Sequence, residues 1–167
     1  MGIKLFHVTS RSYAVGEKLI ASTEKSNSFH RAEKKGLDWV EGILDKYRPD
    51  DAPSRCTAIF TFDEIKFCGL YVVTESIANP VYYKLEVQSS WKAPMAMVNR
   101  INKLGKAMSF KHIVAAKEYW RPTMDWNCYE FLVNEAVVLD KCDPPPSVDI
   151  KNAKSLYFKD VDLTKNI

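Results

Sequence analysis

The heptapeptide Val81-Tyr82-Tyr83-Lys84-Leu85-Glu86-Val87 is the stretch that decides the fold class of this chain. β-Branched and aromatic residues dominate it, and these residue types favour extended strands. Side chains alternate between the two faces of a strand, so its four odd-numbered residues, all apolar or aromatic, fall on one face. We therefore predict a half-buried strand here, directly after the turn signal Asn79-Pro80.

Five more stretches have the short apolar, β-branched or aromatic pattern of strands. The first carries His7 at its end, and the two stretches on either side of Asn134-Glu135 are predicted as two strands or as one strand with a bulge. The predicted strands are Lys4 to Val8, Cys56 to Phe62, Tyr129 to Val133, Ala136 to Leu139 and Ser155 to Val161.

Apolar residues that recur at intervals of three and four mark helices between these strands. Pro49 and Pro53 end the first helix, and Asp63 is placed to cap the second. The last of these segments is predicted as a helix or a loop. The predicted helices are Arg31 to Tyr47, Glu64 to Glu75, Pro94 to Leu104 and Lys111 to Tyr119.

The order of these elements predicts an α+β fold. Strands do not alternate regularly with helices of equal length, which argues against a doubly wound fold. The 167 residues contain no internal repeat, and 46% of them are apolar, which suits a single hydrophobic core. We therefore predict one domain over residues 1–167, built from short strands with flanking helices.

Composition narrows the function classes. No stretch approaches the roughly 20 uninterrupted apolar residues of a membrane helix, and Met1 to Phe6 begin a strand-like run, unlike an export signal. We therefore expect a cytoplasmic protein with no membrane partner. The four cysteines form no C-x-x-C pair, which indicates free thiols and no metal site. The net charge of +3 tolerates a nucleic-acid partner without requiring one.

Two residues stand out as candidates for chemistry. Glu130 lies inside the apolar strand Tyr129 to Val133, and a carboxylate in such a place is costly to bury unless it is paired, ligated or used. The alternative is that Glu130 points outward on an alternating strand. His7 has the same ambiguity, since a histidine at a strand end is often structural. No G-x-G-x-x-G or Walker pattern is present, so a nucleotide site would use other means.

The order of three segments resembles that of the ADP-ribosyltransferase superfamily. Leu5-Phe6-His7-Val8-Thr9-Ser10, followed by Tyr13 to Ile20, resembles the opening of small bacterial members such as the rifampicin-modifying enzymes. Ala58 to Asp63 resembles the second family segment, an aromatic strand before a helix. Tyr129-Glu130-Phe131-Leu132-Val133 is similar to the glutamate-bearing strand of the DNA-targeting DarT toxins and of the poly-ADP-ribose polymerases.

The resemblance implies an ADP-ribosyltransferase-like domain with a split β core and specific residue roles. His7 would hydrogen-bond the nicotinamide-side ribose, the strand backbone at Val8 would hold the carboxamide, and Thr9 would support the ribose. Glu130 would stabilise the oxocarbenium-like centre formed when the nicotinamide bond breaks, and would orient or deprotonate the acceptor. Glu135 is the rival carboxylate, on the opposite face if the strand stays regular.

Phe60 is the candidate for stacking on nicotinamide, although the family has Tyr at this point. Nearby aromatic residues are alternatives, and they are Phe62, Tyr82 and Tyr83. Arg11 and Arg31 are each placed to pair with the NAD pyrophosphate, or are ordinary surface arginines.

We therefore predict an NAD-dependent ADP-ribosyltransferase, acting as a toxin, defence or phage factor, with NAD as co-substrate and an antitoxin as a possible partner. Tyr119-Trp120-Arg121 and Phe110-Lys111-His112 are basic and aromatic stretches that favour a nucleic-acid acceptor. A protein acceptor and a small-molecule acceptor are the alternatives. The competing functions are an NAD glycohydrolase and a non-catalytic binding module on the same fold.

Overall fold

The strand predicted from the opening heptapeptide is the centre of the first sheet. In the computed structural model, which describes residues 1–157, this strand is β4 (Val81–Val87). It lies between β1 (Ile3–Thr9) and β7 (Glu135–Cys142) and is antiparallel to both. Leu85 of β4 is fully buried and pairs with Leu5 of β1, so the alternating apolar face does form the core.

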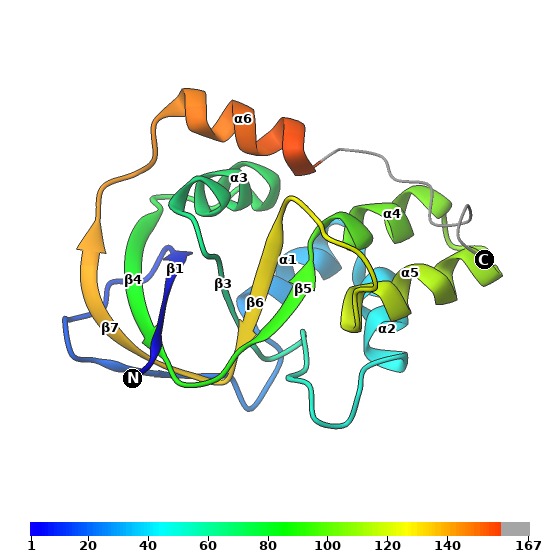
Figure 1. Cartoon of the computed structure of the whole chain (residues 1–167), viewed down its shortest axis with the longest axis horizontal. Coiled ribbons are helices and arrows are strands. Elements are labelled where there is room, and N and C mark those ends of the chain that lie inside the picture. Colours follow the sequence, from blue (N-terminus) through cyan, green and yellow to red (C-terminus); the bar gives the residue numbers. More distant parts are fainter. Residues whose placement is uncertain (158–167) are drawn as a thin grey trace.

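Two antiparallel sheets make up the β core (Figure 1). The first sheet is completed by β2 (Lys18–Ile20), which pairs with β7. The second sheet has the order β3-β6-β5. Phe6 of β1 and Phe62 join the two sheets, because their backbones exchange hydrogen bonds of 2.7 and 2.8 Å. The strands of the second sheet are β3 (Ile59–Thr61), β5 (Trp91–Pro94) and β6 (Tyr129–Val133).

Helices cover both sheets, so the predicted α+β class with a split β core and flanking helices is confirmed. Figure 1 shows α3 and α6 above the four-stranded sheet, and α2, α4 and α5 beyond the three-stranded sheet. No helix among residues 1–157 is long and apolar enough to cross a membrane. The helices are α1 (Asn27–Lys34), α2 (Asp38–Lys46), α3 (Ile65–Glu75), α4 (Ala96–Leu104), α5 (Phe110–Trp120) and α6 (Ser147–Tyr157).

Several predictions need correction. The single helix expected from Arg31 to Tyr47 is two helices, because Gly36 between them has a φ of +67°, outside the right-handed helical region. The residue that precedes α3 is Glu64, without a side-chain cap, so the expected Asp63 cap is wrong.

Strand β5 was not expected, and the helix that follows it begins two residues later than predicted. Residues 155–157 lie in α6, so the start of the last predicted strand is wrong, and its remainder to Val161 lies outside the described residues. The segments on either side of Asn134 are two strands.

Gly36 and Gly42 allow a matched stability test of the helix break. A methyl group on either residue would meet no atom within 4 Å, so packing does not enter the comparison. We expect Gly36→Ala to destabilise the domain by about 1 kcal/mol, because L-residues are strained at positive φ. Gly42→Ala, inside α2, should stabilise it by about 0.5–1 kcal/mol. Urea denaturation measures both, and equal stability of the two variants would contradict the break at Gly36.

Candidate functional site

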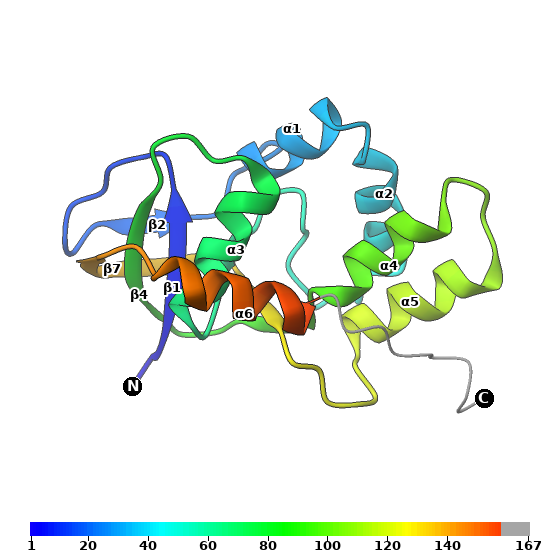
Figure 2. The same cartoon turned by 90° about the horizontal axis from the view of Figure 1, so that it is seen from above.

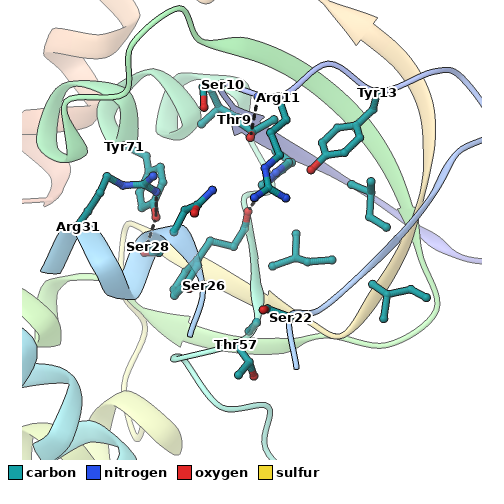
Figure 3. A pocket seen from close by; sticks show the side chains of 18 of the residues that line it. Thr9, Ser10, Arg11, Tyr13, Ser22, Ser26, Ser28, Arg31, Thr57 and Tyr71 are labelled. Atoms are coloured by element: carbon teal, nitrogen blue, oxygen red, sulfur yellow. Dashed lines mark hydrogen bonds between the residues drawn. The ribbon is translucent and has the colours of Figure 1, made fainter. Parts of the chain in front are cut away.

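A pocket of about 370 Å³ opens beside the C-terminal end of β1 (Figure 3). It is lined by His7, Val8, Thr9, Arg11 and Phe60 together. These are the five residues that the sequence predicts to bind the cofactor, and they come from β1, the loop after it, and β3. We call this cavity the first pocket.

His7 lies half-buried in the wall of the first pocket in its neutral form. Its Nδ1 lies 2.8 Å from the carbonyl oxygen of Phe60. A carbonyl only accepts, so Nδ1 carries the proton and donates it. Burial lowers the pKa of His7, and the positive charge of Arg31 lowers it further. The neutral ring therefore keeps Nε2 as a hydrogen-bond acceptor.

The backbone of Val8 offers a donor and an acceptor side by side. Both backbone groups of Phe6 bond to Phe62, so they point away from β4. Alternate residues of an antiparallel strand point their N–H and C=O groups to the same side, so those of Val8 also point away from β4. Within residues 1–157 no backbone group pairs with them. A carboxamide has the complementary acceptor and donor.

The loop after β1 is held in place by a buried tyrosine. The hydroxyl of Tyr83 accepts from the backbone N–H of Tyr13 at 2.9 Å and donates to the carbonyl of Arg11 at 3.4 Å. The backbone N–H of Arg11 donates to Thr9 Oγ1 at 3.2 Å. Tyr83 is only 2% exposed, and its hydroxyl holds both Arg11 and Tyr13 of this loop. Tyr83, one of the alternatives for stacking on nicotinamide, is therefore a positioning residue for this loop.

Four cations line the first pocket, and they differ in their pairing. Lys18 pairs with Glu135 at 2.9 Å and Lys25 pairs with Glu33 at 3.0 Å. Arg11 has no carboxylate within ion-pair distance among the described residues, and Figure 3 shows its side chain reaching into the pocket. An arginine in this state has its full charge and all its donors for an anion.

The N-terminus of α1 forms the wall opposite Arg11 (Figure 3). Ser26 caps this helix by accepting from the backbone N–H of Phe29 at 3.3 Å. The first turn contains no acidic residue, so the positive end of the helix dipole is not compensated by the helix itself. Arg31 of the same helix also lines the pocket, but it pairs with Glu75 at 3.5 Å. Arg11 and the N-terminus of α1 therefore favour a negatively charged ligand between them.

Phe60 and Tyr71 form a stacked aromatic pair in the first pocket. Their ring centroids lie 6.1 Å apart with an angle of 21° between the planes. The hydroxyl of Tyr71 lies 2.8 Å from Ser28 Oγ and accepts from Arg31 Nη2 at 3.4 Å. Burial raises the pKa of Tyr71 to about 12, so the phenol stays neutral. Sequence reasoning missed Tyr71, because its apolar neighbours in α3 predict a residue of the hydrophobic core.

Glu130 lies outside the first pocket, in a second cavity of about 200 Å³ that adjoins it. Ser28 and Tyr71 line both cavities. The side chain of Glu130 is 4% exposed and points to Arg55, whose guanidinium carbon stands 4.9 Å from the ring centroid of Phe60. The structure therefore places the predicted catalytic residue behind the aromatic wall of the predicted NAD pocket, and not in contact with His7.

Arg55 joins two buried carboxylates and a tyrosine. It donates to Glu41 through Nε at 2.6 Å and Nη2 at 3.0 Å, and through Nη1 to Glu130 and to the Tyr119 hydroxyl. Tyr119 in turn donates to Glu130 at 2.5 Å. Burial raises the pKa of Glu130, and Arg55 opposes this shift only in part. A buried carboxylate with a raised pKa beside a cavity is a candidate acid or base.

Burial lowers the pKa of Arg55, but Glu130 and Glu41 outweigh it, so that its pKa is raised well above the usual value. Sequence reasoning missed Arg55 and Glu41. No local signal could have found them, since Arg55 lies 75 residues from Glu130 along the chain.

The remaining candidates have structural partners. Glu135, the rival carboxylate, is 61% exposed and pairs with Lys18. His30 is exposed and pairs with Glu33, and His112 is buried in the cap of α5. The four cysteines are free thiols. Among the described residues no three histidines, cysteines or carboxylates gather as in a metal site.

A scan against protein-family models finds no match, and no curated protein matches the sequence.

Proposed function

We propose that this chain is an NAD-dependent ADP-ribosyltransferase that binds NAD in the first pocket and uses Glu130 in the second cavity for transfer. One observation carries the proposal: the five residues that the sequence predicts to bind NAD line one cavity, together with the N-terminus of α1. One of the five, Arg11, has no carboxylate partner among the described residues. This supports a dianionic ligand with sugar hydroxyls, an aromatic ring and a carboxamide, and NAD has all of these.

The nicotinamide end of NAD and its pyrophosphate have matching groups in the first pocket. The carboxamide pairs with the N–H and C=O of Val8, which point out of the sheet edge. A ribose hydroxyl donates to Nε2 of neutral His7, and the pyrophosphate lies between Arg11 and the N-terminus of α1. The nicotinamide ring lies near the Phe60 and Tyr71 pair, which provides an aromatic surface.

The proposed reaction breaks the bond between C1′ of the ribose and N1 of nicotinamide. The bonding electron pair goes to N1, which neutralises the pyridinium ring, and C1′ forms its new bond with an oxygen or nitrogen of the acceptor. The acceptor loses one proton. The carboxylate of Glu130 stabilises the positive charge that develops at C1′ and takes up this proton. C1′ would lie at the boundary of the two cavities, beside Ser28 and Tyr71.

Two related functions remain as alternatives. With water as acceptor the same site is an NAD glycohydrolase. The pairing of Glu130 with Arg55 favours the other alternative, a non-catalytic binding module, because a buried ion pair of this kind also occurs as a purely structural feature. We extend the proposal to a toxin or defence role, because the strand that carries Glu130 resembles that of the DNA-targeting toxins.

Arg11 provides the test of the NAD site. We expect Arg11→Ala to raise the Kd for NAD at least tenfold, because it removes a charge-assisted contact to pyrophosphate. Isothermal titration calorimetry measures this affinity, and release of nicotinamide from labelled NAD measures turnover. Arg121→Ala is the matched control, since Arg121 is 72% exposed and does not line the pocket. A wild-type protein that neither binds NAD nor releases nicotinamide would overturn the proposal.

A further inference from the structure

The positive charge of this chain is concentrated in one segment. Residues 87–117 contain six lysines and arginines and no aspartate or glutamate, so the segment carries +6 while the rest of the chain carries −3. It includes β5, α4, the loop between α4 and α5, and most of α5. The six cations are Lys92, Arg100, Lys103, Lys106, Lys111 and Lys117. Such an asymmetry indicates a polyanionic partner for the exposed part of this segment.

Exposed apolar side chains lie between the exposed cations of this segment. Phe110 is 67% exposed and Met108 is 52% exposed, and Lys106, Lys111 and Lys117 are exposed as well. In the described part of the chain no carboxylate lies within ion-pair distance of these three lysines. We call these five residues the basic platform, which lies at the end of the molecule away from the four-stranded sheet (Figure 2). An exposed aromatic ring between cations is typical of surfaces that bind single-stranded nucleic acid.

The basic platform is connected to the second cavity through α4. This helix contributes Val98, Asn99 and Asn102 to the cavity wall. Lys106 follows Asn102 by four residues, and four residues span at most about 14 Å. Lys106 therefore lies within about 14 Å of the cavity wall at Asn102, close enough for a polymer bound there to extend to the cavity.

The lining of the second cavity suits a nucleobase. The amides of Asn99 and Asn102 each provide a donor and an acceptor, which is what the polar edge of a base requires. Leu37, Val40 and Val98 provide apolar surface for the flat faces of the ring. The cavity volume of about 200 Å³ admits one base and not a folded protein segment.

We propose that the acceptor is a single-stranded nucleic acid whose phosphates bind the basic platform and one of whose bases enters the second cavity beside Glu130. This inference rests on the proposed transferase function. A nitrogen or oxygen of that base forms the bond to C1′ as nicotinamide leaves with the electron pair, and the proton of the base passes to Glu130.

Charge reversal tests the platform by fluorescence anisotropy with labelled single-stranded DNA and RNA of mixed sequence. The triple variant Lys106→Glu, Lys111→Glu, Lys117→Glu should bind at least 30-fold more weakly than the wild type at 0.1 M salt. The slope of log Kd against log salt should fall by about 2, because each lost phosphate contact contributes about 0.7. The control triple Lys34→Glu, Lys141→Glu, Lys151→Glu changes net charge equally on other exposed sites and should stay within threefold.

The aromatic contact has its own test with a matched control. Phe110→Ala should weaken oligonucleotide binding about tenfold, since base stacking on an exposed ring is lost. Val148→Ala truncates another exposed apolar residue, 59% exposed on α6, and should leave binding unchanged.

Equal losses of oligonucleotide affinity in the platform triple and the control triple would show that only net charge matters, and would overturn the inference.

Transfer of label from NAD separates this inference from the proposed function. If the wild type labels the oligonucleotide and the platform triple does not, while both release nicotinamide without nucleic acid, both proposals stand. If label goes only to protein, and the platform triple transfers it as well as the wild type, the inference is wrong and the transferase stands. If oligonucleotides bind the platform but NAD is neither bound nor cleaved, the transferase fails and the acceptor role fails with it.

Discussion

Replacing Arg55 with methionine is expected to destabilise the domain by about 3–5 kcal/mol at pH 7. Arg55 is 5% exposed and is the shared partner of Glu41 and Glu130, which are themselves buried. Its removal leaves two carboxylates without a compensating charge in a medium that solvates them poorly, and breaking a buried pair in this way costs several kcal/mol. Urea denaturation followed by circular dichroism measures the change.

The matched control for this prediction is Arg121→Met, because the side chain of Arg121 is 72% exposed. We expect a change of less than about 0.5 kcal/mol there. The loss in Arg55→Met should shrink in acid, since protonation of Glu130 removes one of the uncompensated charges. A loss below about 1 kcal/mol at pH 7 would show that these carboxylates do not depend on Arg55, and would contradict the described network.

The sequence was sufficient for the parts of the fold that depend on local pattern. The strand Val81–Val87 was predicted with its observed bounds, because its residue types and its period of two agree. His7, Val8 and Thr9 could be proposed together because they are contiguous on one strand. Phe60 reaches the same pocket through the β3 backbone, whose carbonyl accepts from His7.

The rest depends on contacts between distant residues. Strand β5 consists of Trp91-Lys92-Ala93-Pro94, which has no alternating pattern, and it is a strand because β6 pairs with it. Gly36 interrupts a helical pattern that is otherwise continuous, and its positive φ is not visible in the apolar periodicity. Glu130 was recognised as a carboxylate in an apolar run, but its partner Arg55 lies in a loop that no periodicity marks.

The burial of Glu130 has an energetic consequence. Burial raises the pKa of Glu130 above its ordinary value of 4.5. A group with a raised pKa in the folded state contributes stability below its unfolded pKa, and this contribution is lost as the pH rises through the folded pKa. Ionised Glu130 therefore destabilises the folded domain near neutral pH, which is the expected behaviour of a carboxylate retained for function.

This behaviour makes Glu130→Gln the decisive variant. We expect it to lower ADP-ribosyl transfer and nicotinamide release by about 10²- to 10⁴-fold, because the neutral amide neither accepts the proton nor stabilises positive charge at C1′. Its Kd for NAD should stay within threefold of the wild type, because Glu130 lies outside the first pocket. Labelled NAD and calorimetry measure these quantities.

Stability distinguishes a functional from a structural Glu130. The amide oxygen of Glu130→Gln can still accept from Arg55 and Tyr119, so we expect the variant to be no less stable than the wild type at pH 7. As the pH rises, the free energy of unfolding of the wild type should fall relative to that of this variant. This fall should begin near pH 4.5, the ordinary pKa of a glutamate. Glu135→Gln is the control, because Glu135 is 61% exposed, and its activity should be unchanged. A Glu130→Gln variant that is destabilised but fully active would assign Arg55 and Glu130 to structure alone and leave the binding module as the better description.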